Sequence, residues 1–243
     1  MEEGWDFDAA PAEFKQVQPF LLGLFAVSGT GWLINYFTTI RAAFRDRTSG
    51  VSLIALSNNL AWEFVYAIFH PPPLPIATII VRSWLLVDIF VIYTTVKFAR
   101  AAPGNVNPPL LKHYLPLFVL GGILGFFSGH WALSVLLSPL RAFYWSGMVC
   151  LITMSGTALG LLVQRGHTRG ASYGMWLSRF IASIFAVASL FLRSTHWPQV
   201  WAWSDNILML WLSGAFFVLD ILYGVCFWYT RQLEKQARRQ KLA

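Results

Sequence analysis

Seven long apolar stretches follow one another along this 243-residue chain and constrain its fold more than any other feature. A bilayer core of about 30 Å is crossed by about 20 apolar residues in a helix. Charged residues make up only 12% of the chain, whereas a soluble domain usually carries about a quarter. We therefore expect an all-α membrane protein, a single domain over residues 1–243 that forms a seven-transmembrane helix bundle. The expected helices are 19–40, 51–71, 76–98, 113–135, 140–164, 171–193 and 207–230.

The basic residues in the connections, at the ends of these stretches and in the C-terminal tail predict the orientation of the bundle. Alternate connections and the C-terminal tail carry thirteen of them: Arg41, Arg45, Arg47, Lys97, Arg100, Lys112, Arg165, Arg169, Arg231, Lys235, Arg238, Arg239 and Lys241. The opposite side carries Lys15, Arg141 and Arg193. Basic residues concentrate in cytosolic loops, so the N-terminus is expected in the lumen and the C-terminus in the cytosol. The net charge of +7 thus reflects membrane orientation, and we expect no nucleic-acid partner.

Of the ionisable residues inside the apolar stretches, five stand out: Glu63, Arg82, Asp88, Arg179 and Asp220. Each costs about 2.5–3.5 kcal/mol at a helix centre, so such residues are usually functional. The competing interpretation is that acids and bases neutralise each other as structural pairs, and it stays open for Arg82, Asp88 and Arg179.

The acids lie close to the middle of their helices. Glu63 is about two residues to the luminal side of its helix midpoint, Asp220 about two residues to the cytosolic side, and Asp88 is nearly central. Helical spacing gives the first two acids polar and aromatic neighbours on their own faces, namely Asn59 and Tyr66 for Glu63, and Phe216, Tyr223 and Phe227 for Asp220. The carboxyls would share one central cavity if their helices face each other.

An apolar and aromatic environment suits these acids to proton donation. It disfavours the ionised form of a carboxyl, which can then serve as a general acid at neutral pH. Aromatic rings nearby can stabilise a cationic intermediate. The sequence has no DDxxD cluster to hold magnesium, no histidines at metal-ligand spacing, and no lysine in the last stretch for a retinal Schiff base. The functions that remain are acid–base chemistry or ligand binding in a lipid-accessible cavity, and we expect neither a metal nor a cofactor.

Three separated motifs resemble the small membrane-integral terpene cyclases of fungal meroterpenoid (pyripyropene-type) and indole-diterpene (paxilline-type) biosynthesis. They are NNLAWEFVY at 58–66, TRGAS at 168–172 followed by WLSR at 176–179, and DILYGVCFWY at 220–229. The segments PAEF at 11–14 and GWLINY at 31–36 also fit. The resemblance covers essentially the whole chain.

The resemblance implies an enzyme that protonates the terminal epoxide of a prenylated aromatic, pyrone or indole compound and so starts polyene cyclisation. It assigns the catalytic acids to Glu63 and Asp220. We expect the substrate cavity to draw on Asn59, Trp62, Tyr66, Arg82, Asp88, Arg179, Phe216 and Tyr223. The expected partners are a lipophilic small-molecule substrate, membrane lipid, and an upstream prenyltransferase and epoxidase on the same membrane, which is expected to be the endoplasmic reticulum.

Other functions compete with this interpretation. An epoxyfarnesyl meroterpenoid substrate is favoured over an epoxygeranylgeranyl indole. A seven-helix receptor or small-solute transporter would use the same acids as ligand or proton-relay groups. A purely structural membrane scaffold explains neither Glu63 nor Asp220.

Overall fold

The computed structural model describes residues 6–99 and 109–242, and this part of the chain is helical without any strand. Arg100, which counted toward the predicted orientation, lies outside the described residues. The elements in chain order are α1 (Ala12–Asp46), α2 (Leu53–Phe64), the π-helical turn η2 (Val65–Phe69), α3 (Pro75–Ala99), α4 (Pro109–Leu137), α5 (Pro139–Arg165), α6 (Tyr173–His196), α7 (Pro198–Trp201), the 3-10 turn η3 (Ala202–Ser204) and α8 (Ile207–Leu242).

Six of these helices, α1, α3, α4, α5, α6 and α8, are long and apolar enough to cross a membrane. The second expected span is shorter, because Leu53–Phe69 covers 17 residues, which is the lower end of the usual length. Large apolar side chains face outward, such as Leu86, Leu117 and Val135, which are 62%, 63% and 75% exposed. The chain is therefore a multi-pass membrane protein, while the count of seven and the orientation stay predictions.

Several predicted boundaries were wrong. Helix α1 begins at Ala12 and ends at Asp46, well beyond the predicted 19–40, and α8 continues to Leu242 instead of ending near residue 230. The hydropathy pattern marks only the part of a helix that lipid covers, and the tail of α8 consists mostly of good helix formers. The connection after α6 contains the short helix α7, which Pro198 starts at a position that suits proline.

Local signals in the sequence explain where the helices begin and end. Ser52 and Ser172 cap α2 and α6, since each side-chain oxygen accepts a hydrogen bond from a backbone N–H three residues on, at 3.1 and 3.2 Å. Gly166 ends α5 in the left-handed conformation, with φ of 63°. These caps fix the start of the two helices that carry Glu63 and Arg179.

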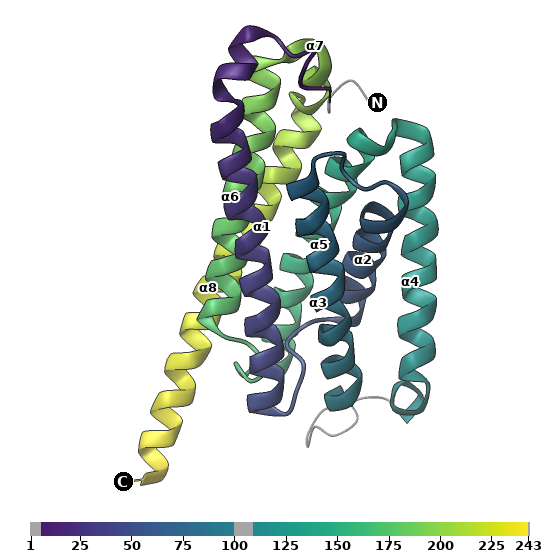
Figure 1. Cartoon of the computed structure of the whole chain (residues 1–243). Coiled ribbons are helices and arrows are strands. Elements are labelled where there is room, and N and C mark those ends of the chain that lie inside the picture. Colours follow the sequence, from purple (N-terminus) through teal and green to yellow (C-terminus); the bar gives the residue numbers. More distant parts are fainter. Residues whose placement is uncertain (1–5, 100–108, 243) are drawn as a thin grey trace.

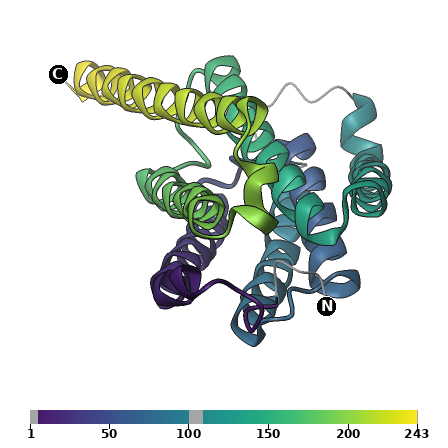
Figure 2. The same cartoon turned by 90° about the horizontal axis from the view of Figure 1, so that it is seen from above.

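The helices form a closed ring around the interior. Helix α1 packs against α6 and α3, α2 packs against α3 and α5, and α8 packs against α5 and α6. Helix α4 lies outside this ring against α2 and α5, as the view from above shows (Figure 2). The start of α1 and the end of α8 lie at opposite ends of the bundle, and α8 extends beyond it (Figure 1). The interior of the ring is therefore where a site shared by several helices can form.

The turn after α1 is clamped to the turn between α5 and α6, where the TRGAS motif lies. The Asp46 carboxylate accepts a hydrogen bond from the Gly170 backbone N–H at 2.7 Å, and Arg165 donates to the Ser49 carbonyl at 2.5 Å. Gly170 has a φ of +81°, which favours glycine. A Cβ on Gly50 would come within 2.1 Å of the Gly170 carbonyl oxygen. The motif thus fixes α1 against α6.

Replacing Gly50 by alanine is expected to destabilise this clamp by about 1–3 kcal/mol, because neither backbone can move aside freely. The measurement is the thermal unfolding midpoint in detergent. Gly160→Ala is the matched control, since a Cβ there meets nothing within 4 Å and alanine is the better helix former. Its midpoint should equal or exceed that of wild type. A Gly50→Ala midpoint equal to wild type would contradict the clamp.

Candidate functional site

Glu63 lies fully buried in α2, at 0% exposure. Its Oε1 accepts hydrogen bonds from the Tyr36 hydroxyl at 2.5 Å and from Asn59 Nδ2 at 3.0 Å. Its Oε2 has no hydrogen-bond partner within the part of the chain that the structure describes. An ionised carboxylate would leave that second oxygen buried and unsolvated, at a high cost. The surroundings of Glu63 therefore suit a neutral acid.

Asp88 on α3 belongs to the same cluster. Asn59 Nδ2 lies 3.3 Å from Asp88 Oδ2, and Asp88 is 2% exposed. Among the described residues, neither Asp88 nor Glu63 forms a salt bridge. Two uncompensated carboxylates around one amide would repel each other strongly in an apolar bundle. The cluster of Tyr36, Asn59, Glu63 and Asp88 therefore favours a shared proton, and we call it the acid cluster.

Asp220 on α8 has different surroundings, although it is also 0% exposed. Its Oδ1 accepts hydrogen bonds from Arg179 Nε at 3.0 Å, from Arg179 Nη2, and from the Ser155 hydroxyl at 2.8 Å. Its Oδ2 has no hydrogen-bond partner in the described chain. A guanidinium in contact compensates the charge of a carboxylate through charge-assisted hydrogen bonds. The two predicted catalytic acids are thus unlike: among the described residues, Asp220 has a cation in contact and Glu63 has none.

Two cavities lie inside the ring of helices. The first, here called the aromatic cavity, has about 850 Å³ of atom-free space including its opening. The rings that line it include Phe25, Trp32, Trp62, Trp84, Phe143 and Tyr144. The second, the polar cavity, has about 550 Å³ measured in the same way. Its polar lining includes Asn35, Asp88, Arg179 and Tyr223. Tyr36 and Asn59 line both cavities.

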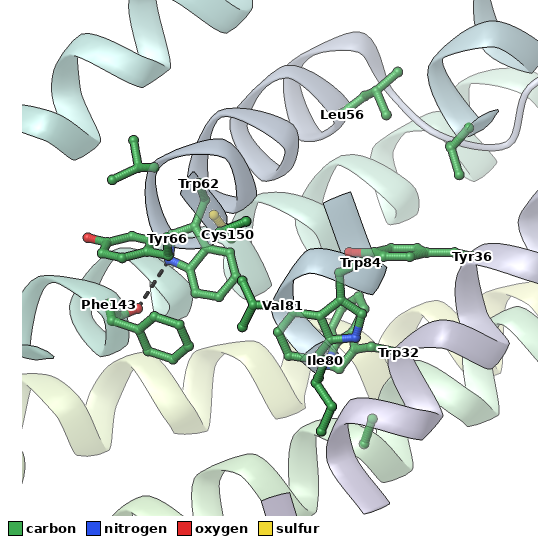
Figure 3. Packing of buried hydrophobic residues seen from close by; sticks show 14 of the residues in the cluster. Trp32, Tyr36, Leu56, Trp62, Tyr66, Ile80, Val81, Trp84, Phe143 and Cys150 are labelled. Atoms are coloured by element: carbon green, nitrogen blue, oxygen red, sulfur yellow. Dashed lines mark hydrogen bonds between the residues drawn. The ribbon is translucent and has the colours of Figure 1, made fainter. Parts of the chain in front are cut away.

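The walls of the aromatic cavity are held in place by hydrogen bonds from the indole groups. Trp62 Nε1 donates to the Phe143 carbonyl at 3.1 Å, and Trp84 Nε1 donates to the Gly29 carbonyl at 3.0 Å. Figure 3 shows Trp62, Tyr66 and Phe143 gathered in one part of the cluster and Trp32, Tyr36 and Trp84 in another. Fixed aromatic rings of this kind can stabilise a cation in the cavity.

The structure brings most of the predicted site residues together around these cavities. Trp62 lines the aromatic cavity, Asn59 lines both, and Asp88, Arg179 and Tyr223 line the polar cavity. In the described chain, Glu63 and Asp220 line neither cavity, and their hydrogen-bond partners stand between them and the space. Tyr66 and Phe216 are fully buried outside both linings.

Arg82 lies apart from the other predicted residues. Its side chain is exposed, and its Nε donates to the Ala67 carbonyl at 3.3 Å. Ala67 belongs to η2, the wide turn that follows Glu63 by two residues, and such π-helical turns are frequent near functional sites. Arg82 therefore supports the backbone next to Glu63 and does not reach the acid cluster.

Two hydrogen-bond partners of the acids were missing from the prediction, Tyr36 and Ser155. Tyr36 was noted only as part of the GWLINY segment, and Ser155 was not singled out. Asn35 and Tyr36 form a pair in a span whose other polar side chains are serines and threonines, which is a usable signal. A single serine in a membrane helix carries no such signal, because serine often bonds to its own helix. Among the described residues, no three His, Cys, Asp or Glu side chains gather as a metal site.

Comparison with known proteins identifies the family of this chain. The family model of Pyr4-like transmembrane terpene cyclases matches residues 5–233. Terpene cyclase cle7 of Aspergillus versicolor is 76% identical over 243 residues, which is 100% of both chains. Terpene cyclase esdpB of Penicillium shearii is 55% identical over 96% of this chain and 94% of its own. Terpene cyclase olcD of Penicillium canescens is 47% identical over 96% and 95%. This chain therefore belongs to the Pyr4-like transmembrane terpene cyclases.

Proposed function

We propose that this terpene cyclase protonates the terminal epoxide of a prenylated aromatic or pyrone meroterpenoid, with an epoxyfarnesyl chain, and so starts polyene cyclisation. The observation that carries the proposal is the pairing of a buried, uncompensated acid with an aromatic cavity. Glu63 has no ion-pair partner in the described part of the chain, and it shares its hydrogen bonds with residues that line that cavity. A neutral acid next to rings that stabilise cations is what this reaction requires.

Glu63 is the source of the proton in this mechanism. The proton reaches the epoxide oxygen, the bond from that oxygen to the tertiary carbon breaks, and the carbon becomes a cation. Successive alkenes attack this cation in the folded chain, and loss of a proton from the last cation completes an isomerisation. Positioned proton transfer contributes about 10²–10⁴-fold. The walls of the aromatic cavity contribute the rest by holding the chain in a reactive conformation.

Asp220 acts differently, as the ionised partner of Arg179. Arg179 and Tyr223 line the polar cavity, and the Arg179 guanidinium lies 5.3 Å from the centre of the Tyr223 ring. Asp220 thus holds Arg179 in place at the wall of the polar cavity. Its unpartnered Oδ2 remains available to assist the return of the proton.

The proposal includes the setting of the enzyme. The bundle has seven spans with its N-terminus in the lumen of the endoplasmic reticulum and its C-terminus in the cytosol. A lipophilic substrate enters from the lipid, having received its prenyl chain and its epoxide from a prenyltransferase and an epoxidase on the same membrane. The outward-facing apolar side chains suit direct entry from lipid.

Incubating membranes that contain the enzyme with an epoxyfarnesyl pyrone tests the proposal. We expect a cyclised isomer of identical mass, because protonation and deprotonation balance, and none from membranes without the enzyme. An epoxygeranylgeranyl indole is the second arm, and faster turnover of that compound would reassign the substrate class. Binding of either compound without a new isomer would instead favour a receptor or transporter.

A further inference from the structure

The proposed proton source does not reach the space where the substrate would lie. Glu63 lines neither cavity in the described chain, while Tyr36 lines both. We propose that the Tyr36 hydroxyl hands the proton to the epoxide oxygen and that Glu63 replaces that proton in the same step. This inference rests on the proposed function and adds a second catalytic residue to it.

The contacts of Tyr36 suit such a transfer. Its hydroxyl oxygen is 2.5 Å from Glu63 Oε1 and accepts a hydrogen bond from Asn59 Nδ2 at 2.8 Å. The residue is 5% exposed, and its ring centre lies 6.1 Å from that of Trp32. In Figure 3 the side chain extends from α1 toward the middle of the aromatic cluster, with the hydroxyl at its inner end. The phenol therefore bridges the acid and the cavity.

Asn59 also lines both cavities, but it cannot take this role. An amide N–H donates hydrogen bonds without giving up its proton under these conditions, whereas a phenol can exchange its proton. Asn59 Nδ2 has two hydrogens for three nearby acceptors, Tyr36 Oη at 2.8 Å, Glu63 Oε1 at 3.0 Å and Asp88 Oδ2 at 3.3 Å. When Glu63 donates from Oε1, the Tyr36 and Asp88 oxygens can take one hydrogen each. Asn59 is therefore a positioning residue that orients the phenol oxygen between Glu63 and the aromatic cavity.

The step balances within the named groups. In this step the neutral Glu63 donates a hydrogen bond from Oε1 to the Tyr36 oxygen. In the resting state the direction is the reverse, because the Tyr36 hydroxyl donates to Oε1 at 2.5 Å. The phenol hydrogen points at the epoxide oxygen. The Tyr36 O–H and the Glu63 O–H break together, new O–H bonds form on the substrate and on Tyr36, and the epoxide C–O bond opens. Tyr36 ends neutral, Glu63 ends as a carboxylate, and the substrate carries the positive charge.

Tyr36→Phe tests the inference, because it removes the hydroxyl and keeps the ring in both cavity walls. We expect the single-turnover rate to fall at least about 100-fold, with KM within about threefold of wild type because the ring contacts remain. Tyr229→Phe is the matched control, since Tyr229 lies on α8 and is 58% exposed. That variant should cyclise the substrate at the wild-type rate. Thermal unfolding in detergent establishes that both variants are folded.

A second measurement separates proton transfer from positioning. The wild-type rate is measured in mixtures of H₂O and D₂O and plotted against the deuterium fraction. Two protons in flight give a downward-curved plot, and we expect that curve for wild type and a straight line for the residual rate of Tyr36→Phe. A straight wild-type plot, the absence of an isotope effect, or a Tyr36→Phe rate within threefold of wild type would overturn the inference. Failure of wild type to cyclise the epoxide would overturn the proposed function instead.

Discussion

Glu63→Gln is expected to lower the cyclisation rate by about 10³-fold, within the 10²–10⁴-fold range of a general acid. Glutamine keeps the length and shape of the side chain, and its carbonyl oxygen still accepts hydrogen bonds from Tyr36 and Asn59. It has no acid proton to give, so the epoxide stays closed whichever group carries the proton across. Turnover of the epoxyfarnesyl substrate by membranes measures the effect.

Folding should survive this substitution, because the replaced carboxyl has no ion-pair partner among the described residues to leave behind. The matched control is Glu13→Gln, the same chemical change at an exposed position in the first turn of α1. That variant should turn over within twofold of wild type. Wild-type turnover by Glu63→Gln would remove Glu63 from the role of acid.

The sequence alone predicted the class of fold and the acids that matter to the proposal. The length of an apolar stretch is a good guide to a membrane-spanning helix, because such a helix must match the thickness of the bilayer. The cost of an ionisable group in lipid makes Glu63 and Asp220 conspicuous. The ends of α1 and α8 were not predictable in this way, since a helix can continue into water beyond the lipid-covered part.

Adjacency of the helices could not be read from one sequence. Arg179 and Asp220 are 41 residues apart, and Tyr36 and Glu63 are 27 residues apart. The pairing of Asp220 with Arg179, and the lack of any such partner for Glu63 in the described chain, follow from which helices face each other across the ring. The prediction treated the two acids alike for this reason, and it also placed Arg82 with the site although its side chain turns outward.

Asp220→Asn is expected to lower both the stability and the activity of the enzyme. It leaves the guanidinium of Arg179, which is 5% exposed, without its carboxylate. Removing one partner of a buried ion pair costs about 3–5 kcal/mol, since the remaining charge stays desolvated. The thermal unfolding midpoint in detergent should fall accordingly, and cyclisation should be lost even in the fraction that remains folded.

The double variant Arg179→Gln/Asp220→Asn separates the structural effect from the functional one. Two neutral amides can bond to each other and to Ser155, so the unfolding midpoint should return close to wild type, because replacing a whole buried pair is often neutral. Activity should stay lost, since the wall of the polar cavity no longer carries the Arg179 guanidinium, which Asp220 holds there in the wild-type enzyme. Each protein is compared at equal folded concentration in the membrane assay. Recovery of turnover together with stability would make the pair structural, and Glu63 would then be the sole acid that the reaction needs.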